Sequence, residues 1–298
     1  MNNNGYLQEV LHEQTLAPES DELKNLQEQR AEVEQLLRDY FDDCSPSIRY
    51  GGSKAKGTMI KAAYDLDVIC YFPHDDTAAG ETLEDIYENT RKALEADSWV
   101  EPKASVLRLM DRELKVDFHI DVVPGRYTDD TKTDSFLYHA SGEKKRLKTN
   151  LDVHIAHVKG GGVTEAIRLL KLWRFLNGLR IKHFALELLV VKLLKDKKSA
   201  VLATQLEHVW QEFRDHAESL TVEDPANRTG NDLSHLLDAS IKAELSAVAR
   251  ATLSLIEQSG WEAVFGALAE KSAKEKAAAL SRAAAAITTP TKPWLPDA

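Results

Sequence analysis

Two short acidic motifs carry the side chains best suited to do chemistry. Asp65 and Asp67 begin one apolar segment, and Asp117 and Asp121 lie in a second. Side chains alternate between the two faces of a strand, so Asp65 and Asp67 point the same way if the segment is a strand. Neighbouring carboxylates repel one another unless a cation lies between them, and Mg²⁺ prefers such oxygen ligands. We expect Asp65, Asp67 and Asp121 to be catalytic and to bind two Mg²⁺ or Mn²⁺ ions.

The third metal ligand has a competitor. Asp117, His119 and Asp121 share one face of the second predicted strand. We take Asp121 as the ligand. Asp117 keeps two alternatives: it is the ligand in place of Asp121, or it supports the ligands from behind. His119 is expected to have a structural or product-side role. In a site of this kind, one ion activates the attacking hydroxyl and the other holds a triphosphate.

A Gly-rich turn, Gly51–Thr58, precedes the first acidic motif. Glycines let the backbone approach a phosphate closely, and N–H groups at the start of a helix favour anions. Ser53 adds a hydroxyl donor, and Lys56 adds positive charge. The order of residues differs from that of a Walker P-loop. We expect Gly52, Ser53 and Lys56 to bind the phosphates of a nucleotide.

Periodicity predicts the elements that must position these residues in the first half of the chain. Residues 20–43 carry a helical apolar stripe behind Ser20, a good N-cap. Strands are expected from Ile48, over Leu66–Phe72, over Val100–Met110 and over Leu114–Val123, with a helix over Gly80–Asp97. A turn at Asp111 would join the last two strands in a hairpin.

After about residue 150 the strand signal disappears. The expected helices are Val163–Gly178, Phe184–Leu194, Ala200–Ser219, Leu233–Glu257 and Trp261–Ile287. The prediction is an α+β fold: a mixed catalytic core over 1–150, a helical domain over 151–287 that closes a nucleotide cleft, and a flexible Pro-rich tail over 288–298. A long N-terminal helix is expected to span both halves.

Composition limits the classes of function. The net charge of −10 argues against direct nucleic-acid binding, because duplex affinity rests on cation–phosphate contacts. No window reaches the roughly 18 apolar residues of a membrane span, and the N-terminus lacks a secretory pattern. The two cysteines, Cys44 and Cys70, are far apart and predict no disulfide framework. We expect a cytoplasmic protein.

The order of the motifs resembles one superfamily. Gly51–Thr58, Asp65-Leu-Asp67 and Asp121-Val-Val-Pro124 are similar to motifs of oligoadenylate synthetases, archaeal-type CCA-adding enzymes and the bacterial cGAS/DncV-like nucleotidyltransferases, or CD-NTases. The resemblance continues in the second half at Leu169–Trp173, His183–Leu189 and Asp224–Asp232. It implies a polymerase-β-like core with a helical domain behind it.

The resemblance also implies roles for three residues of the second half. By position, Lys171 contacts the donor triphosphate, Phe184 stacks on the donor base, and His183 lies beside that base. The alternatives are an ordinary amphipathic-helix lysine at Lys171 and a core aromatic residue at Phe184.

Departures from the other members narrow the implied function. The chain lacks the zinc-binding insertion of the animal cyclic GMP–AMP synthase and the RNA-grasping extension of archaeal CCA-adding enzymes. The resemblance therefore favours a synthase that condenses ATP and other NTPs into a cyclic oligonucleotide for anti-phage (CBASS) signalling, under a regulatory partner protein or C-terminal conjugation machinery. The alternatives are transfer to tRNA or another macromolecule, linear oligoadenylate synthesis, and a catalytically dead nucleotide sensor.

Overall fold

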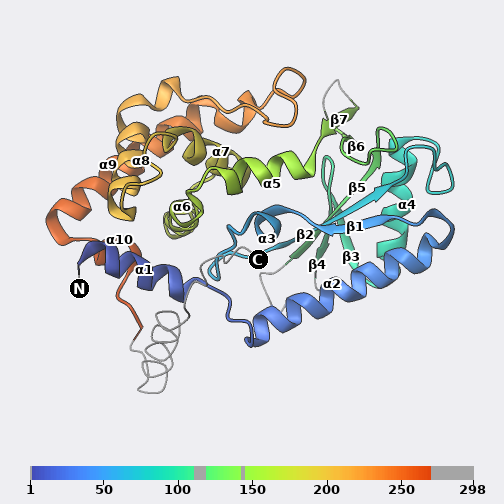
Figure 1. Cartoon of the computed structure of the whole chain (residues 1–298), viewed down its shortest axis with the longest axis horizontal. Helices are drawn as coiled ribbons and strands as arrows, with labels where there is room; N and C mark the ends of the chain where they lie inside the picture. Colours follow the sequence, from blue (N-terminus) through green and yellow to red (C-terminus); the bar gives the residue numbers. More distant parts are fainter. Residues whose placement is uncertain (1, 111–118, 142–144, 270–298) are drawn as a thin grey trace, which may run out of the picture. The chain divides into compact units, whose positions relative to one another are not determined.

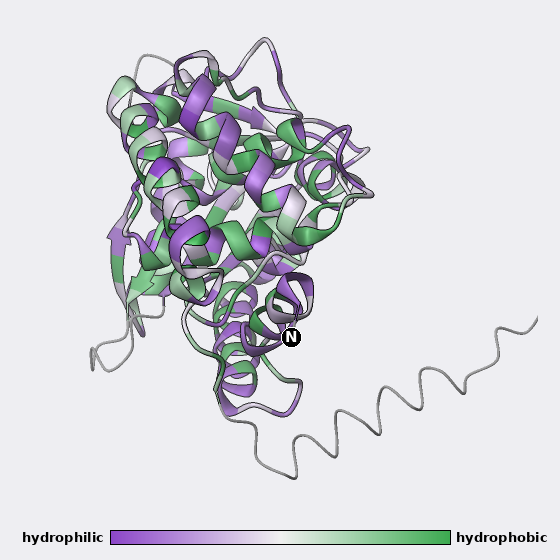
Figure 2. Cartoon of the chain, turned by 90° about the vertical axis from the view of Figure 1, so that its left-hand side faces the viewer, coloured by the Kyte–Doolittle hydropathy of each residue, from purple (hydrophilic) through white to green (hydrophobic). Residues whose placement is uncertain are grey.

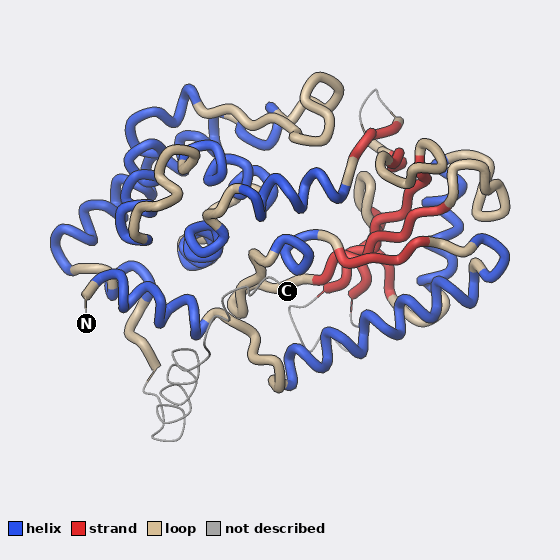
Figure 3. The backbone as a smooth tube through the Cα atoms, in the orientation of Figure 1, coloured by secondary structure: helices blue, strands red, loops and turns tan. Residues whose placement is uncertain are grey.

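The computed structural model describes residues 2–110, 119–141 and 145–269. Residues 1–265 form one compact unit, and residues 266–298 form a second. Within the first unit, the described strands all precede Asn150 and a run of helices follows it (Figures 1 and 3). This confirms the predicted α+β class, while the division into separate domains at residue 150 stays a prediction.

A mixed sheet positions the acidic motifs. Its strands are β1 (Ser47–Tyr50), β2 (Leu66–Phe72), β3 (Trp99–Pro102), β4 (Leu107–Met110), β5 (His119–Tyr127), β6 (Ser135–Tyr138) and β7 (Arg146–Thr149). Their order is β1-β2-β5-β4-β3, with β6 and β7 continuing from β5. The β2–β5 pair is parallel and the other pairs are antiparallel. Parallel pairs are normally buried, and the β-branched and aromatic residues of β2 suit that position.

Two helices cover one face of the sheet, α2 (Asp21–Tyr40) and α4 (Leu83–Glu95) (Figure 1). Ser20 caps α2 as predicted, because its hydroxyl accepts a hydrogen bond from the backbone N–H of Leu23. Thr82 caps α4 in a capping box with Asp85. Apolar residues of both helices pack on those of β2 and β5 to form the main core of this half.

The N-terminal segment reaches both halves with two helices rather than the single predicted one. α1 (Asn3–Glu13) packs on α6 (Thr164–Leu176) and α8 (Leu202–His216), whereas α2 packs on the sheet. Pro18 lies between them and cannot continue a helix, because it lacks a backbone N–H and clashes with the preceding turn.

The second half is helical, as predicted. Its remaining helices are α5 (Leu151–Gly160), α7 (His183–Leu193), α9 (Ala239–Ser259) and α10 (Glu262–Phe265), and a short α3 (Gly52–Lys56) lies in the first half. Trp173, Trp210 and Phe213 pack together in the core of the helices. Most helices in Figure 2 carry both hydrophobic and hydrophilic residues, as amphipathic helices do. No helix among the described residues is apolar over the length that a bilayer crossing requires.

Several boundaries differ from the sequence prediction. The strand expected over Val100–Met110 is a hairpin, β3–β4, closed by a hydrogen bond from Lys103 N to Val106 O. Of the helix expected over Trp261–Ile287, the described part contains α10, Glu262–Phe265, and Gly266 follows it with a φ of 89°. The expected helix Leu233–Glu257 instead begins after Asp238, which caps α9. Short strands β6 and β7 and helix α5 were not predicted.

Parts of the prediction lie outside the described residues. These are the hairpin turn at Asp111, the competing ligand Asp117, most of the last predicted helix and the tail 288–298.

Candidate active site

The fold brings the three predicted aspartates together. Asp67 on β2 lies directly beside Asp121 on β5, because the two strands are paired in parallel with these residues in register. Asp65 immediately precedes β2 and lies beside the same strand pair. Ligand atoms of Asp65, His119 and Asp121 all lie within 4.8 Å of one another, the spacing of a metal-binding group.

His119 is closer to the carboxylates than the sequence led us to expect. Its Nε2 lies 3.6 Å from Asp65 Oδ2 and 3.8 Å from Asp121 Oδ2. The same nitrogen is buried and has no hydrogen-bond partner among the described residues. Sequence reasoning placed His119 on the right face but gave it no role at the metal, because strand alternation says nothing about distances across the sheet.

Asp67 lies against the Gly-rich turn. Gly52, the first residue of α3, has a φ of 48°, and a Cβ atom there would lie 1.5 Å from Asp67 Oδ2. The N–H of Gly51 donates a hydrogen bond of 2.8 Å to the backbone carbonyl of Asp67. Only glycine fits at position 52, since any side chain would collide with the carboxylate. The turn and the acidic motif therefore form one structural element.

The acids are incompletely neutralised by the described residues around them. Desolvation, together with the charges of Asp65 and Asp121, raises the pKa of Asp67 to about 7. Burial opposes ionisation of Asp65 too, but the neighbouring His119 lowers the pKa of that carboxyl below its ordinary value. Clustered oxygen ligands with excess negative charge suit a divalent cation, so these residues fit the predicted Mg²⁺ or Mn²⁺.

One cation beside the acids was missed by sequence reasoning. Arg108 on β4 lies opposite Asp121 and donates two hydrogen bonds to it, from Nε to Oδ1 and from Nη2 to Oδ2, each 2.8 Å long. The signal was present in the alternation of Leu107, Arg108 and Leu109, which places the arginine on the opposite face from its apolar neighbours. Pairing it with Asp121 required the strand register.

Ser53 follows Gly52 in α3. Its hydroxyl oxygen is buried and has no hydrogen-bond partner among the described residues. Buried hydroxyls are normally hydrogen-bonded, so an unpaired one next to the glycine that contacts Asp67 suits contact with a ligand. This position agrees with the expected phosphate contact, which stays a prediction.

The other predicted lysines lie in a second, buried cluster. Lys56 Nζ lies 2.7 Å from Glu187 Oε2, and Lys171 Nζ lies 2.6 Å from Glu187 Oε1. The Thr58 hydroxyl donates to Glu187 Oε1 at 2.6 Å and accepts from Lys171 Nζ at 3.0 Å. Although burial opposes its ionisation, the charges of Lys171 and Lys56 lower the pKa of Glu187 to about 2. We call these four residues the Glu187 network.

Glu187 was not predicted as a site residue. The signal for it was an acid in the mostly apolar sequence Phe184–Leu194, where Lys192 is the other charged residue. A buried carboxylate requires partners, but the partners on α3 and α6 are far away in the sequence.

The residues carried over from the resemblance lie around this network. Lys171 is only 2% exposed, so a triphosphate cannot reach it in this conformation. The ring of Phe184 lies 5.1 Å from the ring of His154, measured between centroids, and 5.1 Å from Lys56 Nζ. The roles of Lys171 and Phe184 at the donor nucleotide stay predictions.

His183 has a partner of its own. Its Nε2 lies 2.9 Å from Nη1 of Arg174. Burial and the charges of Lys171 and Arg174 lower the pKa of His183 to about 4, so this imidazole is neutral at pH 7. A neutral imidazole can accept the arginine hydrogen bond, and its predicted place beside the base stays a prediction.

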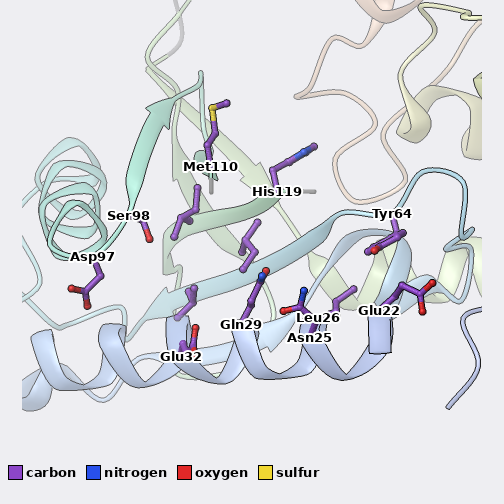
Figure 4. A pocket seen from close by; sticks show the side chains of 13 residues that line it. Glu22, Asn25, Leu26, Gln29, Glu32, Tyr64, Asp97, Ser98, Met110 and His119 are labelled. Carbon is purple, nitrogen blue, oxygen red and sulfur yellow. The ribbon is translucent and has the colours of Figure 1, made fainter. Parts of the chain in front are cut away.

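A cavity of about 300 Å³ lies against α2, and none of the three predicted aspartates lines it. Asn25 and Gln29 of α2 and His119 of β5 line it together with Tyr64 (Figure 4). Its other lining residues include the acids Glu22, Glu32 and Asp97. Because this lining is acidic, the cavity is unsuited to a triphosphate.

Comparison with known proteins identifies the fold. No protein-family model matches the sequence, and no curated protein is similar to it. Three similar structures are CdnC of E. coli MS115-1 in a complex with HORMA-deltaN, the CD-NTase CdnG of Bradyrhizobium diazoefficiens with GTP, and the Vibrio cholerae cyclic AMP-GMP synthase DncV with the linear intermediate 5′ pppA(3′,5′)pG.

Their sequences are distant but their folds agree. CdnC is 20% identical with a TM-score of 0.66, and the match covers 90% of this chain and 98% of that one. CdnG is 14% identical with a TM-score of 0.67, and the match covers 95% of this chain and 98% of that one. DncV is 17% identical with a TM-score of 0.58, and the match covers 80% of this chain and 72% of that one. The chain therefore has the fold of the bacterial CD-NTases, as the resemblance implied.

Proposed function

We propose that this protein is a metal-dependent nucleotidyltransferase that joins NTPs into a cyclic oligonucleotide and releases pyrophosphate. The observation that carries the proposal is the junction of Asp67 with Gly52, which places an under-neutralised carboxylate group against a turn that can bind phosphate. A metal site and a phosphate site in contact are what phosphoryl transfer requires.

Each residue has a role in this proposal. Asp65, Asp67 and Asp121 would hold two Mg²⁺ or Mn²⁺ ions, which when bound supply Lewis-acid activation of a hydroxyl and neutralise phosphate charge. The Ser53 hydroxyl, which has no partner in the described part of the chain, donates to a phosphate oxygen. The Glu187 network holds the C-terminal end of α3 through Lys56 and so fixes the orientation of the turn. His119 lies where it can hold Asp65 and Asp121 in place.

The proposed substrates and product follow from the structural neighbours. CdnG was solved with GTP, and DncV, a cyclic AMP-GMP synthase, with a linear dinucleotide intermediate. By analogy we propose ATP and other NTPs as substrates here, with ring closure in a second transfer. A role in anti-phage signalling is proposed on the same basis, and the CdnC–HORMA complex supports regulation by a partner protein.

The test is product analysis. Purified protein is incubated with all four NTPs, each radiolabelled in turn, with Mg²⁺ and with Mn²⁺, and the products are separated and weighed by mass spectrometry. We expect a phosphatase-resistant product with the mass of a cyclic di- or trinucleotide, and none from an Asp65→Asn variant. Label in acid-insoluble material would indicate transfer to a macromolecule, and phosphatase-sensitive oligomers would indicate linear synthesis. Metal-independent turnover would contradict the proposal.

A further inference from the structure

Four charged residues lie in one row across the sheet. Asp67 on β2 pairs with Asp121 on β5, Asp121 pairs with Arg108 on β4, and Arg108 pairs with Glu101 on β3. Directly opposed residues on neighbouring strands point to the same face and contact one another. Arg108 therefore lies between two carboxylates, one at the candidate metal site and one on the edge strand.

In the structure, Arg108 is bound to the carboxylate on the metal side. Its two hydrogen bonds engage both oxygens of Asp121, and the side chains are 31% and 13% exposed. Paired, parallel N–H···O bonds of this kind are the strongest that a carboxylate makes with a side chain. Because the pair is partly buried, salt screens its attraction less than that of an ion pair at the surface.

The second carboxylate has a different partner. Glu101 is bound to Lys103, with Nζ 2.5 Å from Oε1, and the two side chains are 46% and 40% exposed. An exposed lysine pair contributes little and exchanges readily. Glu101 thus offers Arg108 an alternative position one strand further from the metal site.

A divalent cation and the guanidinium compete for Asp121. Both are attracted by the same two oxygens, and they repel each other across a few ångströms in a site that is partly shielded from water. A cation can use Asp121 fully only if Arg108 withdraws.

We propose that Arg108 is a positioning residue, a resident counter-ion that holds Asp121 in the metal-free protein and moves to Glu101 when divalent cations bind. The proposal rests on the proposed metal site and adds a control on its affinity. Arg108 makes metal binding weaker than it would be with the carboxylates alone, and it keeps Asp121 paired while the site is empty.

The test is Mn²⁺ binding to the whole protein without nucleotide, followed by the electron paramagnetic resonance of free Mn²⁺ and by calorimetry. Arg108→Gln should bind Mn²⁺ about tenfold more tightly than wild type, because the competing charge is gone. Glu101→Gln should bind it several-fold more weakly, since Arg108 loses its alternative position. Lys103→Gln should bind it more tightly, because Glu101 is then free to accept Arg108.

A double variant separates pairing from long-range charge effects. If Glu101 acts through Arg108, then Glu101→Gln should have little effect on Mn²⁺ affinity in an Arg108→Gln background. An equal loss of affinity in both backgrounds would overturn the proposal, and so would unchanged or weaker binding by Arg108→Gln. Should Arg108→Gln fail to fold, the opposite shifts expected of Glu101→Gln and Lys103→Gln still decide the matter.

The same titration tests the underlying site separately. Asp65→Asn should lose most of the Mn²⁺ binding seen in wild type. If wild type binds no Mn²⁺, or Asp65→Asn binds it equally well, the proposed metal site itself is wrong. If that control behaves as expected but the Arg108 and Glu101 variants do not, only the counter-ion proposal fails.

Discussion

The protein contains two clusters of charged residues that share few features beyond their charge. In the carboxylate group of Asp65, Asp67 and Asp121, negative charge is in excess and the pKa of Asp67 is raised to about 7. In the Glu187 network, one carboxylate is shared by two lysines and a threonine, and the pKa of the acid is lowered to about 2. The first cluster sets one bound arginine, Arg108, against three carboxylates, whereas the second sets two lysines against one carboxylate.

This difference distinguishes a cluster that can bind a ligand from one that stabilises the fold. An under-neutralised cluster costs stability until a ligand supplies the missing charge, which is typical of functional sites. A satisfied buried cluster has no capacity for a ligand in this conformation, but it fixes the elements that meet there. The Glu187 network joins α3, α6 and α7, so we interpret it as the support that holds the Gly-rich turn in place.

The largest effect is expected at the carboxylates. Asp65→Asn keeps the shape of the side chain but removes a charged metal ligand, so turnover of NTPs should fall by about 1000-fold or more. The measurement is pyrophosphate release at saturating Mg²⁺, with circular dichroism as the control for folding. Activity above a few per cent of wild type would show that Asp65 is not a catalytic ligand.

The next largest effect is expected in the network, on stability rather than on chemistry. Glu187→Gln leaves two buried lysines without a counter-charge and should lower the free energy of unfolding by about 3 kcal/mol at pH 7. Glu257→Gln, at an exposed position of α9, is the matched control and should cost little. The measurement is urea denaturation. If both variants are equally stable, the network is not a support.

Asp67→Asn should raise the free energy of unfolding of the metal-free protein, whereas Glu187→Gln should lower it. A carboxyl whose pKa is raised in the fold binds its proton more tightly in the folded than in the unfolded state, so wild type loses stability as the pH rises from about 4 to about 7. The variant lacks this loss and should be more stable than wild type by a few kcal/mol at pH 8, with the gain vanishing near pH 4. Urea denaturation in EDTA measures it. A pH-independent difference would mean that the raised pKa of Asp67, caused by burial and by the neighbouring acids, is not the reason.

The smallest effect is expected at Ser53. Ser53→Ala removes one neutral hydrogen-bond donor to phosphate, which contributes about 1 kcal/mol, so the KM for NTP should rise about fivefold with a smaller change in kcat. Initial rates over a range of NTP concentrations measure both constants. A fall in kcat at constant KM would instead place Ser53 at the reacting atoms, within the carboxylate cluster rather than beside it.

Much of the fold could be predicted because its signals are local. The cap at Ser20, the β-branched run of β2 and the apolar stripes of α6 and α8 each lie within a few residues, and the structure confirms those elements. Strands β6 and β7 were missed because four residues are too few to show alternation. The β3–β4 hairpin was missed because we read Val100–Met110 as one continuous strand and overlooked the turn that follows Pro102.

The sequence by itself determined which residues have the chemistry for the site. Asp65, Asp67, Asp121, Gly52 and Ser53 follow from residue type, order and strand alternation, and the fold brings them together. Lys171 could not be assigned in this way, because its partner Glu187 lies on another helix.

Only the tertiary structure decided which charges are paired. Arg108 meets Asp121 through the β4–β5 register, His119 approaches Asp65 across β2 and β5, and Lys56 meets Glu187 across α3 and α7. The physical reason is that the energy of a charge depends on distance and on the local dielectric, and both are set by which elements pack together. Sequence spacing carries neither quantity, so a ligand site and a buried support can present the same residue types along the chain.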